Sequence, residues 1–183
     1  MSDKRLLAEG VFTLDGFLSA PECAELIALA ESRGFAAADV RTASGSRPMT
    51  HVRNNDRLEL RSPDWAARFW RQLQAVELPE LDGQRACALS SWFRFYRYVP
   101  GQRFRMHRDG RLQEDGLESR LTFLLYLNEG FVGGETTFKT VAVSPARGSA
   151  LLFVHEHWHE GSALSSGVKY VLRSDVLYGS RTG

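Results

Sequence analysis

Two stretches in the first half of the chain place apolar residues at helical spacing. Ser19 followed by Glu22 has the form of a capping box, in which a hydroxyl and a carboxylate three residues on satisfy the first N–H groups of a helix. The apolar positions that follow are Leu26, Ile27, Leu29 and Ala30, and Gly34 is a typical stop signal. The second stretch opens at Ser62, with Pro63 at the first helical position. Its apolar face is Trp65, Phe69, Leu73 and Val76, so the pattern predicts one helix after Ser19 and another after Ser62.

The second half of the chain carries short segments rich in β-branched, aromatic and leucine residues. Turn signals separate them, among them Pro100-Gly101 and Gly133-Gly134. The predicted strands are Leu89–Val99, Leu121–Leu127, Phe138–Val143, Ser149–Val154 and Val168–Tyr178. Helices followed by short strands are typical of an α+β domain with a mainly antiparallel barrel or sandwich. We therefore expect a single domain over residues 1–183, with helical support over about 1–80 and a β core over about 86–180.

Composition and charge narrow the class of protein. The 23 basic and 22 acidic side chains leave a net charge of +1, which does not indicate a nucleic-acid partner. No apolar run is long enough for a signal peptide or a membrane span, so we expect no membrane partner. The two cysteines, Cys23 and Cys87, indicate a reducing compartment rather than a disulfide framework, and we expect a cytoplasmic location.

The segment His107-Arg108-Asp109 is the first candidate for chemistry. Residues two apart on an extended chain point to the same side, so one imidazole and one carboxylate can face the same ion. A third ligand from a distant strand would complete a facial triad, the geometry that suits Fe(II) and leaves positions open for substrate and oxygen. A surface pair beside the Pro100-Gly101 turn is the alternative interpretation.

A third ligand is available in the segment His155-Glu156-His157-Trp158-His159. Its three alternating histidines could themselves hold a metal, or they could be a solvated strand end. Further along, Lys169 and Arg173 share one face of the last predicted strand, together with Asp175. Two inward cations in a mostly apolar strand need partners. A bound dicarboxylate would supply them, and ion pairing with Asp175 is the structural alternative.

Taken together, the stretch from Tyr98 to Tyr178 resembles the catalytic core of the 2-oxoglutarate and Fe(II) oxygenases of the prolyl 4-hydroxylase type. The matching residues, in order, are Tyr98-x-Pro100-Gly101-Gln102, His107-x-Asp109, Arg120-x-Thr122-Phe123, Tyr126-Leu127-Asn128, Gly133-Gly134-Glu135-Thr136-x-Phe138, Pro145-x-x-Gly148, Leu152-Phe153-x-His155-x-x-x-His159-Glu160-Gly161 and Lys169-Tyr170. The resemblance implies a double-stranded β-helix, or jelly roll, backed by the N-terminal helices.

The resemblance also implies a cofactor set and roles for individual residues. His107, Asp109 and His159 match the iron ligands, and Lys169 matches the residue that pairs with the distal carboxylate of 2-oxoglutarate. Tyr98 and Thr122 match positions that hydrogen-bond the same carboxylate; Arg173 could assist them or pair with Asp175. The implied cofactors are Fe(II), 2-oxoglutarate and O2, with ascorbate as a reductant. His155 is expected to be structural, and His157 is left out of the site.

The substrate does not follow from the resemblance. The polar run around His51 precedes the core, and Arg53, Asn55 and Arg57 are candidates for substrate recognition, with a solvated loop as the alternative. The expected activity is hydroxylation of an unactivated C–H bond, with release of succinate and CO2. A prolyl residue of a protein is the first expected substrate, and a free amino acid or other small molecule is the second. A non-catalytic module that binds metal or an oxoacid is the third interpretation, which the intact ligand set disfavours.

Overall fold

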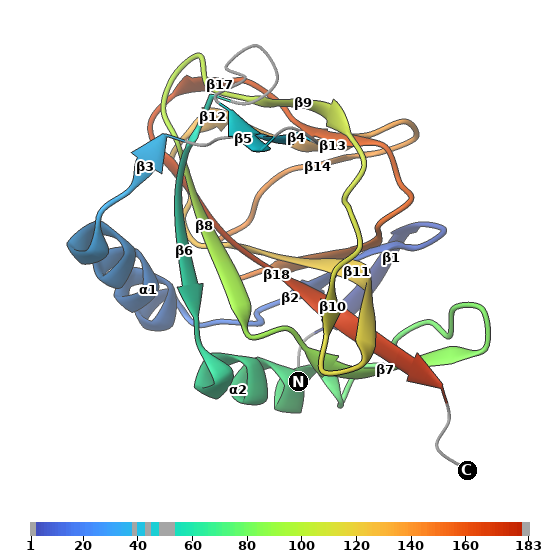
Figure 1. The fold of residues 1–183 in the computed structure, drawn as a ribbon. Coiled ribbons are helices and arrows are strands. Elements are labelled where there is room, and N and C mark those ends of the chain that lie inside the picture. Colours follow the sequence, from blue (N-terminus) through green and yellow to red (C-terminus); the bar gives the residue numbers. More distant parts are fainter. Residues whose placement is uncertain (1–2, 38–39, 43–44, 48–53, 181–183) are drawn as a thin grey trace.

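The computed structural model describes residues 3–37, 40–42, 45–47 and 54–180. Its largest element is an antiparallel sheet of ten strands (Figure 1). The order across this sheet is β1 (Asp3–Ala8), β2 (Val11–Asp15), β15 (Ala150–Val154), β11 (Leu117–Tyr126), β18 (Lys169–Ser180), β8 (Trp92–Tyr98), β6 (Asp56–Arg61) and β3 (Ala36–Ala37), with β10 (Gln113–Glu114) on β11 and β7 (Gln84–Leu89) on β18.

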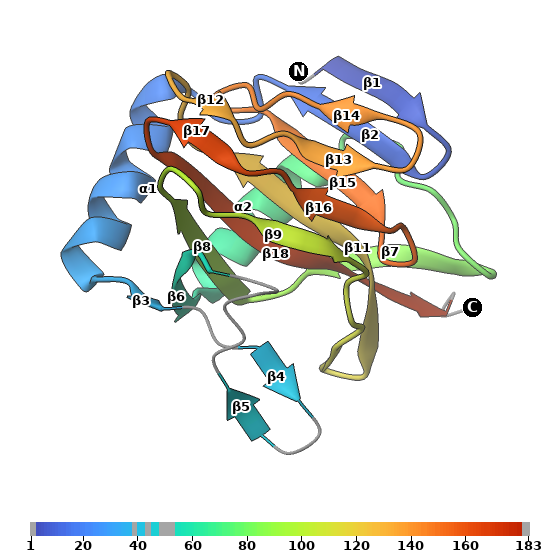
Figure 2. The same ribbon diagram turned by 90° about the horizontal axis from the view of Figure 1, so that it is seen from above.

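A smaller antiparallel sheet faces the large one (Figures 1 and 2). Its order is β14 (Ala142–Val143), β13 (Thr136–Phe138), β16 (His159–Gly161) and β9 (Phe104–His107). Two further pairs are β12 (Val132–Gly133) with β17 (Leu164–Ser166), and β4 (Val40–Thr42) with β5 (Gly45–Arg47). Two facing antiparallel sheets confirm the expected jelly roll.

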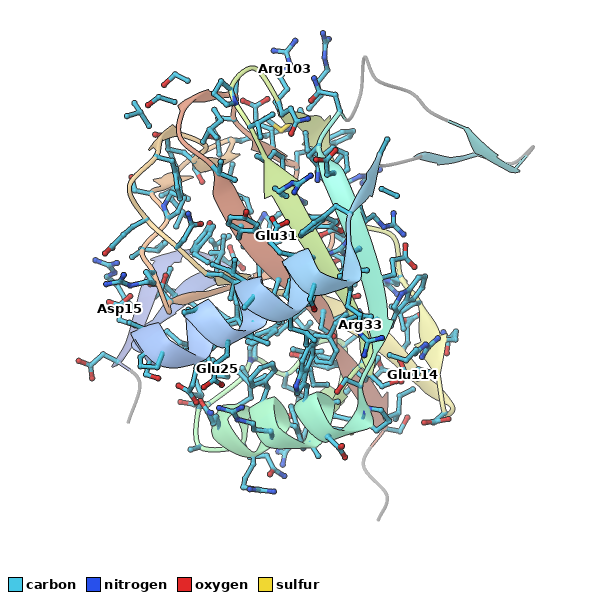
Figure 3. The ribbon with its side chains drawn as sticks, turned by 90° about the vertical axis from the view of Figure 1, so that its left-hand side faces the viewer. Asp15, Glu25, Glu31, Arg33, Arg103 and Glu114 are labelled. Carbon is cyan, nitrogen blue, oxygen red and sulfur yellow. The ribbon has the colours of Figure 1, made fainter. Side chains whose placement is uncertain are left out.

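The two helices cover the face of the large sheet that points away from the small one (Figure 3). Helix α1 (Ala20–Arg33) has the predicted capping box: the Ser19 side chain accepts from the Glu22 N–H, and the Ser19 N–H donates to the Glu22 carboxylate at 2.7 Å. Helix α2 (Pro63–Leu73) is capped by Ser62, which accepts from the Trp65 N–H at 3.2 Å. It ends at Leu73, so Val76 lies beyond it rather than on it, although Val76 still packs against the core.

Strict alternation along the strands of the large sheet builds one core on each of its faces. On β8, Phe93 and Phe95 pack under the helices, whereas Tyr96 and Tyr98 face the small sheet. The same alternation holds on β11, β15 and β18. The barrel interior between the sheets therefore receives the polar face of β18, which carries Lys169 and Arg173.

Three expectations about the elements need correction. The helices do back the sheet, but the first 80 residues also supply strands β1, β2, β3 and β6, so this segment is only partly helical. The strand predicted over 89–99 is broken at Ser90-Ser91, where β7 ends and β8 begins. The strand predicted over 138–143 is interrupted by a turn, because Phe138 ends β13 and Ala142–Val143 form β14. No helix in the described part of the chain has the length and apolar character needed to cross a membrane.

Candidate active site

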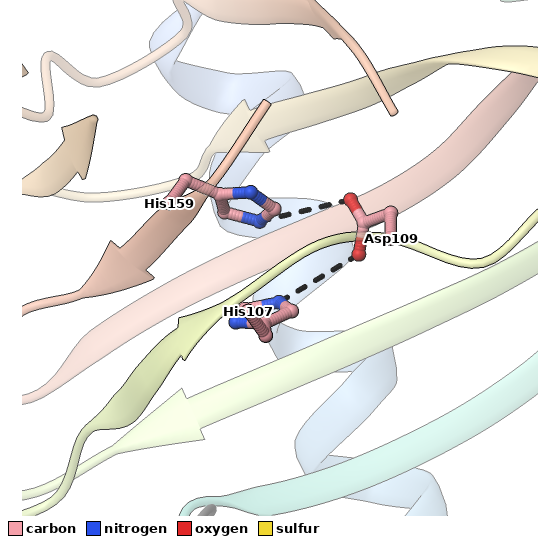
Figure 4. Close-up of side chains that lie close together, drawn as sticks. All are labelled: His107, Asp109 and His159. Atoms are coloured by element: carbon pink, nitrogen blue, oxygen red, sulfur yellow. Dashed lines mark ion pairs between the residues drawn. The ribbon is translucent and has the colours of Figure 1, made fainter. Parts of the chain in front are cut away.

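His107, Asp109 and His159 meet at one end of the barrel (Figure 4). His107 ends β9 and His159 begins β16, and the antiparallel register of these strands places the two histidines directly opposite each other. Nε2 of His107 and Nε2 of His159 each lie 3.7 Å from a different oxygen of Asp109. One potential ligand atom from each residue lies within 4.8 Å of the others, a spacing that could hold one metal ion.

Both imidazole rings are oriented by their own strands. Nδ1 of His107 lies 2.7 Å from the Arg105 carbonyl oxygen, and Nδ1 of His159 lies 3.0 Å from the His157 carbonyl oxygen. A carbonyl can only accept, so Nδ1 carries the hydrogen and Nε2 keeps a free lone pair that faces Asp109. The Phe104 ring stacks on His107 at 3.6 Å, which restricts rotation of that ring. The donor set and its orientation fit a divalent metal.

The charges in the site match what metal ligation requires. Burial opposes ionisation of Asp109, but the Arg173 guanidinium holds the pKa of its carboxyl well below the usual range. Burial lowers the pKa of His159 to about 4, and the charge of Asp109 only partly opposes this. At neutral pH Asp109 is therefore a carboxylate and His159 is neutral, the protonation states that bind metal.

A pocket extends from the three residues into the barrel and ends at Lys169. Lys169 is 4% exposed, and its ammonium donates to the Gly134 carbonyl at 2.5 Å. The ammonium also lies over the rings of Tyr98 and Tyr126, 5.3 and 5.5 Å from their centroids. Burial lowers the pKa of Lys169 to about 8, although Glu135 favours the charged form. Among the residues that the structure describes, none forms an ion pair with Lys169.

Tyr98 and Thr122 both line this pocket, as the sequence predicts. The Thr122 hydroxyl, however, donates to Oδ2 of Asp109 at 2.5 Å. Thr122 lies opposite Asp175 on β18 and opposite Phe153 on β15, a register that brings its hydroxyl to Asp109 at the end of the pocket away from Lys169. Its expected hydrogen bond to 2-oxoglutarate stays a prediction, and its observed role is to hold Asp109.

Arg173 connects the site to a second buried carboxylate. Its Nη2 lies 3.1 Å from Oδ1 of Asp109 and 3.1 Å from Oδ1 of Asp175. Arg94 on β8 pairs with the other oxygen of Asp175. Nε2 of His155, which is almost fully buried, lies 3.2 Å from Asp175. Burial opposes ionisation of Asp175, yet the two guanidinium groups lower its pKa to about 2.

The neighbours of Asp175 were only partly predicted from the sequence. The proposed pairing of Arg173 with Asp175 is present, and His155 lies near the site without joining the three clustered residues. Arg94 and the ring of Phe104 were missed. Arg94 could have been found from its place on the same face of β8 as Tyr96 and Tyr98.

Of the three residues expected to recognise substrate, the two that the structure describes do not line the pocket. Arg53 lies outside the described residues. Asn55 is fully buried and donates to the Asp56 carbonyl at 3.0 Å. Arg57 lies on β6 and pairs with Glu59. Neither Asn55 nor Arg57 lines the pocket, so their role in substrate recognition stays a prediction.

Comparisons with known proteins agree with this geometry. Residues 93–174 match the model of the 2OG-Fe(II) oxygenase superfamily, a range that contains all three clustered residues and Lys169. No curated protein sequence matches the chain.

Several solved structures share the fold. The viral collagen prolyl hydroxylase of Paramecium bursaria Chlorella virus-1, in complex with 2OG, has a TM-score of 0.67 and 23% identity over 92% of this chain and 96% of its own. A prolyl-4-hydroxylase of Pseudomonas putida has a TM-score of 0.68 and 20% identity over 92% of both chains. A prolyl hydroxylase of Trichoplax adhaerens, in complex with a peptide fragment of the hypoxia inducible factor oxygen degradation domain, has a TM-score of 0.72 and 16% identity over 92% of this chain and 83% of its own.

The fold, the site and the family match together define the class of protein. Residues 93–174 match the 2OG-Fe(II) oxygenase superfamily, and the chain is a 2-oxoglutarate-dependent dioxygenase whose fold resembles that of the prolyl hydroxylases. Its cofactors are Fe(II), 2-oxoglutarate and O2.

Proposed function

We propose that this chain hydroxylates a prolyl residue of a protein substrate, and that His107, Asp109 and His159 hold the iron. The single observation that carries the proposed site is that this cluster and the buried Lys169 line the same pocket. A buried ammonium without an ion-pair partner in the described part of the chain is costly, and a carboxylate at the end of the pocket would offset that cost. 2-Oxoglutarate has a carboxylate at each end, so one molecule could reach both Lys169 and the metal.

Each residue around the pocket then has a definite task. Lys169 binds the far carboxylate, and the rings of Tyr98 and Tyr126 favour its charged form because cations are attracted to aromatic faces. Arg173 and Thr122 each hold one oxygen of Asp109. Bound Fe(II), with 2-oxoglutarate and O2, supplies the oxidising power to hydroxylate an unactivated C–H bond, and 2-oxoglutarate leaves as succinate and CO2.

The prolyl substrate is supported by the structures of similar fold. Three of them are named prolyl hydroxylases, and the Trichoplax protein holds a peptide. The direct test is succinate release from 2-oxoglutarate with Fe(II), measured with proline-containing peptides and with free amino acids. Release that depends on a peptide, with a mass gain of one oxygen on its proline, supports the proposal. Release with free proline alone would assign a small-molecule hydroxylase instead.

A further inference from the structure

Strand β9, which carries His107, lies at the edge of the small sheet. The order β14, β13, β16, β9 leaves β9 paired with β16 alone among the described strands (Figure 2). An edge strand presents backbone N–H and C=O groups to which an extended peptide can add. The strand that holds a proposed iron ligand is thus also a possible docking edge for a substrate chain.

Positive charge is concentrated on β9 and the residues that flank it. Four exposed arginines lie within nine residues, and they are Arg103, Arg105, Arg108 and Arg111. Asp109 is the acidic residue within this segment, and its carboxylate lies in the cluster with His107 and His159. Arg111 pairs with Glu118 and Glu156, whereas no described residue forms an ion pair with the other three arginines. Because the whole chain has a net charge of only +1, this concentration is local to the site.

An open hollow beside the metal cluster carries exposed apolar groups. Met106 and Trp158 are 42% and 40% exposed, and each directly precedes one of the two clustered histidines in the chain. The Arg108 guanidinium lies 5.0 Å from the Trp158 ring centroid. Met106 and Trp158 line a hollow that also touches His107 and Asp109. This hollow is separate from the pocket that ends at Lys169. A side chain seated there would approach the metal from outside the barrel.

We propose that β9 and this hollow bind an extended, acidic peptide segment of the substrate, an inference that rests on the proposed protein hydroxylase function. Carboxylates on the peptide would pair with Arg103, Arg105 and Arg108, while its backbone adds to the edge of β9 that no described strand occupies. An extended chain rises about 3.3 Å per residue, so the five residue steps from Arg103 to Arg108 span at most roughly 16 Å of backbone. That span exceeds a single amino acid and matches a peptide of several residues.

The probes are fluorescein-labelled peptides with a central proline flanked by glutamates, by glutamines or by lysines, and binding is measured by anisotropy. The test variant is Arg103→Glu/Arg105→Glu. The control is Arg33→Glu/Arg71→Glu, which makes the same charge change at exposed positions of α1 and α2. Figure 3 shows Arg33 between the two helices, near the middle of the view, and Arg103 at its top. Exposed charge pairs stabilise by a few tenths to about 1 kcal/mol each, so reversing two should weaken binding about tenfold or more.

The inference predicts that the glutamate peptide binds tightest, that the test variant loses this affinity, and that the control keeps it. The test variant should also gain affinity for the lysine peptide. Equal binding of the three peptides, or equal losses in both variants, would overturn the inference. So would free glutamate competing as well as the peptide, or a single-stranded oligonucleotide binding more tightly through the same arginines.

Anisotropy measures peptide binding without turnover, so the test of the binding surface can fail or succeed independently of the test of the hydroxylase activity. Arginine-dependent binding of the glutamate peptide without any succinate release would reject the hydroxylase and keep the binding surface. Succinate release with a glutamine peptide, unchanged in Arg103→Glu/Arg105→Glu, would keep the hydroxylase and reject the acidic substrate.

Discussion

One guanidinium nitrogen of Arg173 serves two buried carboxylates, because its Nη2 lies 3.1 Å from Oδ1 of Asp109 and 3.1 Å from Oδ1 of Asp175. Asp109 belongs to the cluster that it forms with His107 and His159, and Asp175 does not. Arg173 is the partner that the two carboxylates share, beside Arg94 at Asp175 and Thr122 at Asp109. Arg173 is therefore a positioning residue in the absence of metal, and its loss should affect the fold before it affects any reaction.

Arg173→Met should destabilise the metal-free protein by roughly 3–5 kcal/mol, because two buried carboxylates lose their shared partner. Urea unfolding measures this, and Arg173→Lys, which keeps a charge, should lose less. Added Zn(II) should restore more stability to Arg173→Met than it adds to the wild type, since the metal then neutralises Asp109. An unfolding free energy within about 0.5 kcal/mol of the wild type would show that Arg173 does not hold these carboxylates.

Replacing a clustered residue should remove both metal binding and turnover. His107→Ala, Asp109→Ala and His159→Ala are each expected to abolish succinate release and weaken Fe(II) binding. His157→Ala is the matched control, because its ring lies outside the cluster although its carbonyl orients His159. If His157→Ala lost iron while His159→Ala retained it, the proposed ligand set would be wrong.

Metal exchange separates binding from chemistry. Mn(II), Co(II) and Zn(II) should all occupy the site, because imidazole and carboxylate ligands accept several divalent ions. None of them should support turnover, because among these metals and iron only iron is expected to react with O2 in this donor set and reach the oxidation state that attacks an unactivated C–H bond. The check is succinate release from protein loaded with each metal under rigorously iron-free conditions. Full activity of the zinc form would refute the oxygenase mechanism.

The pH dependence of 2-oxoglutarate binding should report on Lys169. Burial lowers its pKa from 10.5 to about 8, so the empty pocket loses its positive charge as the pH rises through about 8. The affinity for 2-oxoglutarate should therefore fall above that pH. Lys169→Arg should show no such fall over the same range, because a guanidinium stays protonated.

The lowered pKa of Lys169 also predicts how the free energy of unfolding changes with pH. Because the folded state binds this proton less tightly than the unfolded chain, the Lys169 contribution to the free energy of unfolding should rise between about pH 8 and 10.5. In the metal-free and cosubstrate-free protein, Lys169→Met should lack this rise. Urea unfolding across that range compares the two proteins. Identical pH profiles would mean that the ammonium is not buried as the structure has it.

The sequence was most informative in strands, where the side chains on one face recur every two residues. That period predicts that Lys169 and Arg173 point inward, and the structure confirms it. The pairing of Arg94 with Asp175 was not predictable, because the two residues are 81 positions apart and meet only through the register of β8 and β18.

The strands of the first 80 residues escaped prediction for a related reason. β2 is buried from Val11 to Leu14 without alternation, because it is covered on both faces, so its apolar run resembles a piece of helix as much as a strand. β6 looks polar because only Leu58 and Leu60 turn toward the core while charged residues alternate with them. In both cases the neighbouring strand, and not the local sequence, determines the structure.

Calorimetric titration of 2-oxoglutarate into the Mn(II)-loaded wild type, Lys169→Ala and Lys169→Arg tests the central claim most directly. Removing one side of a buried charge pair costs about 3–5 kcal/mol, which corresponds to a loss of roughly a hundred- to a few thousandfold in affinity. The account predicts such a loss in Lys169→Ala, a partial loss in Lys169→Arg, and nearly unchanged Mn(II) binding in both, since none of the three proposed metal ligands is altered. An unchanged 2-oxoglutarate affinity in Lys169→Ala would contradict the account, because the buried ammonium would then not be the partner of the cosubstrate.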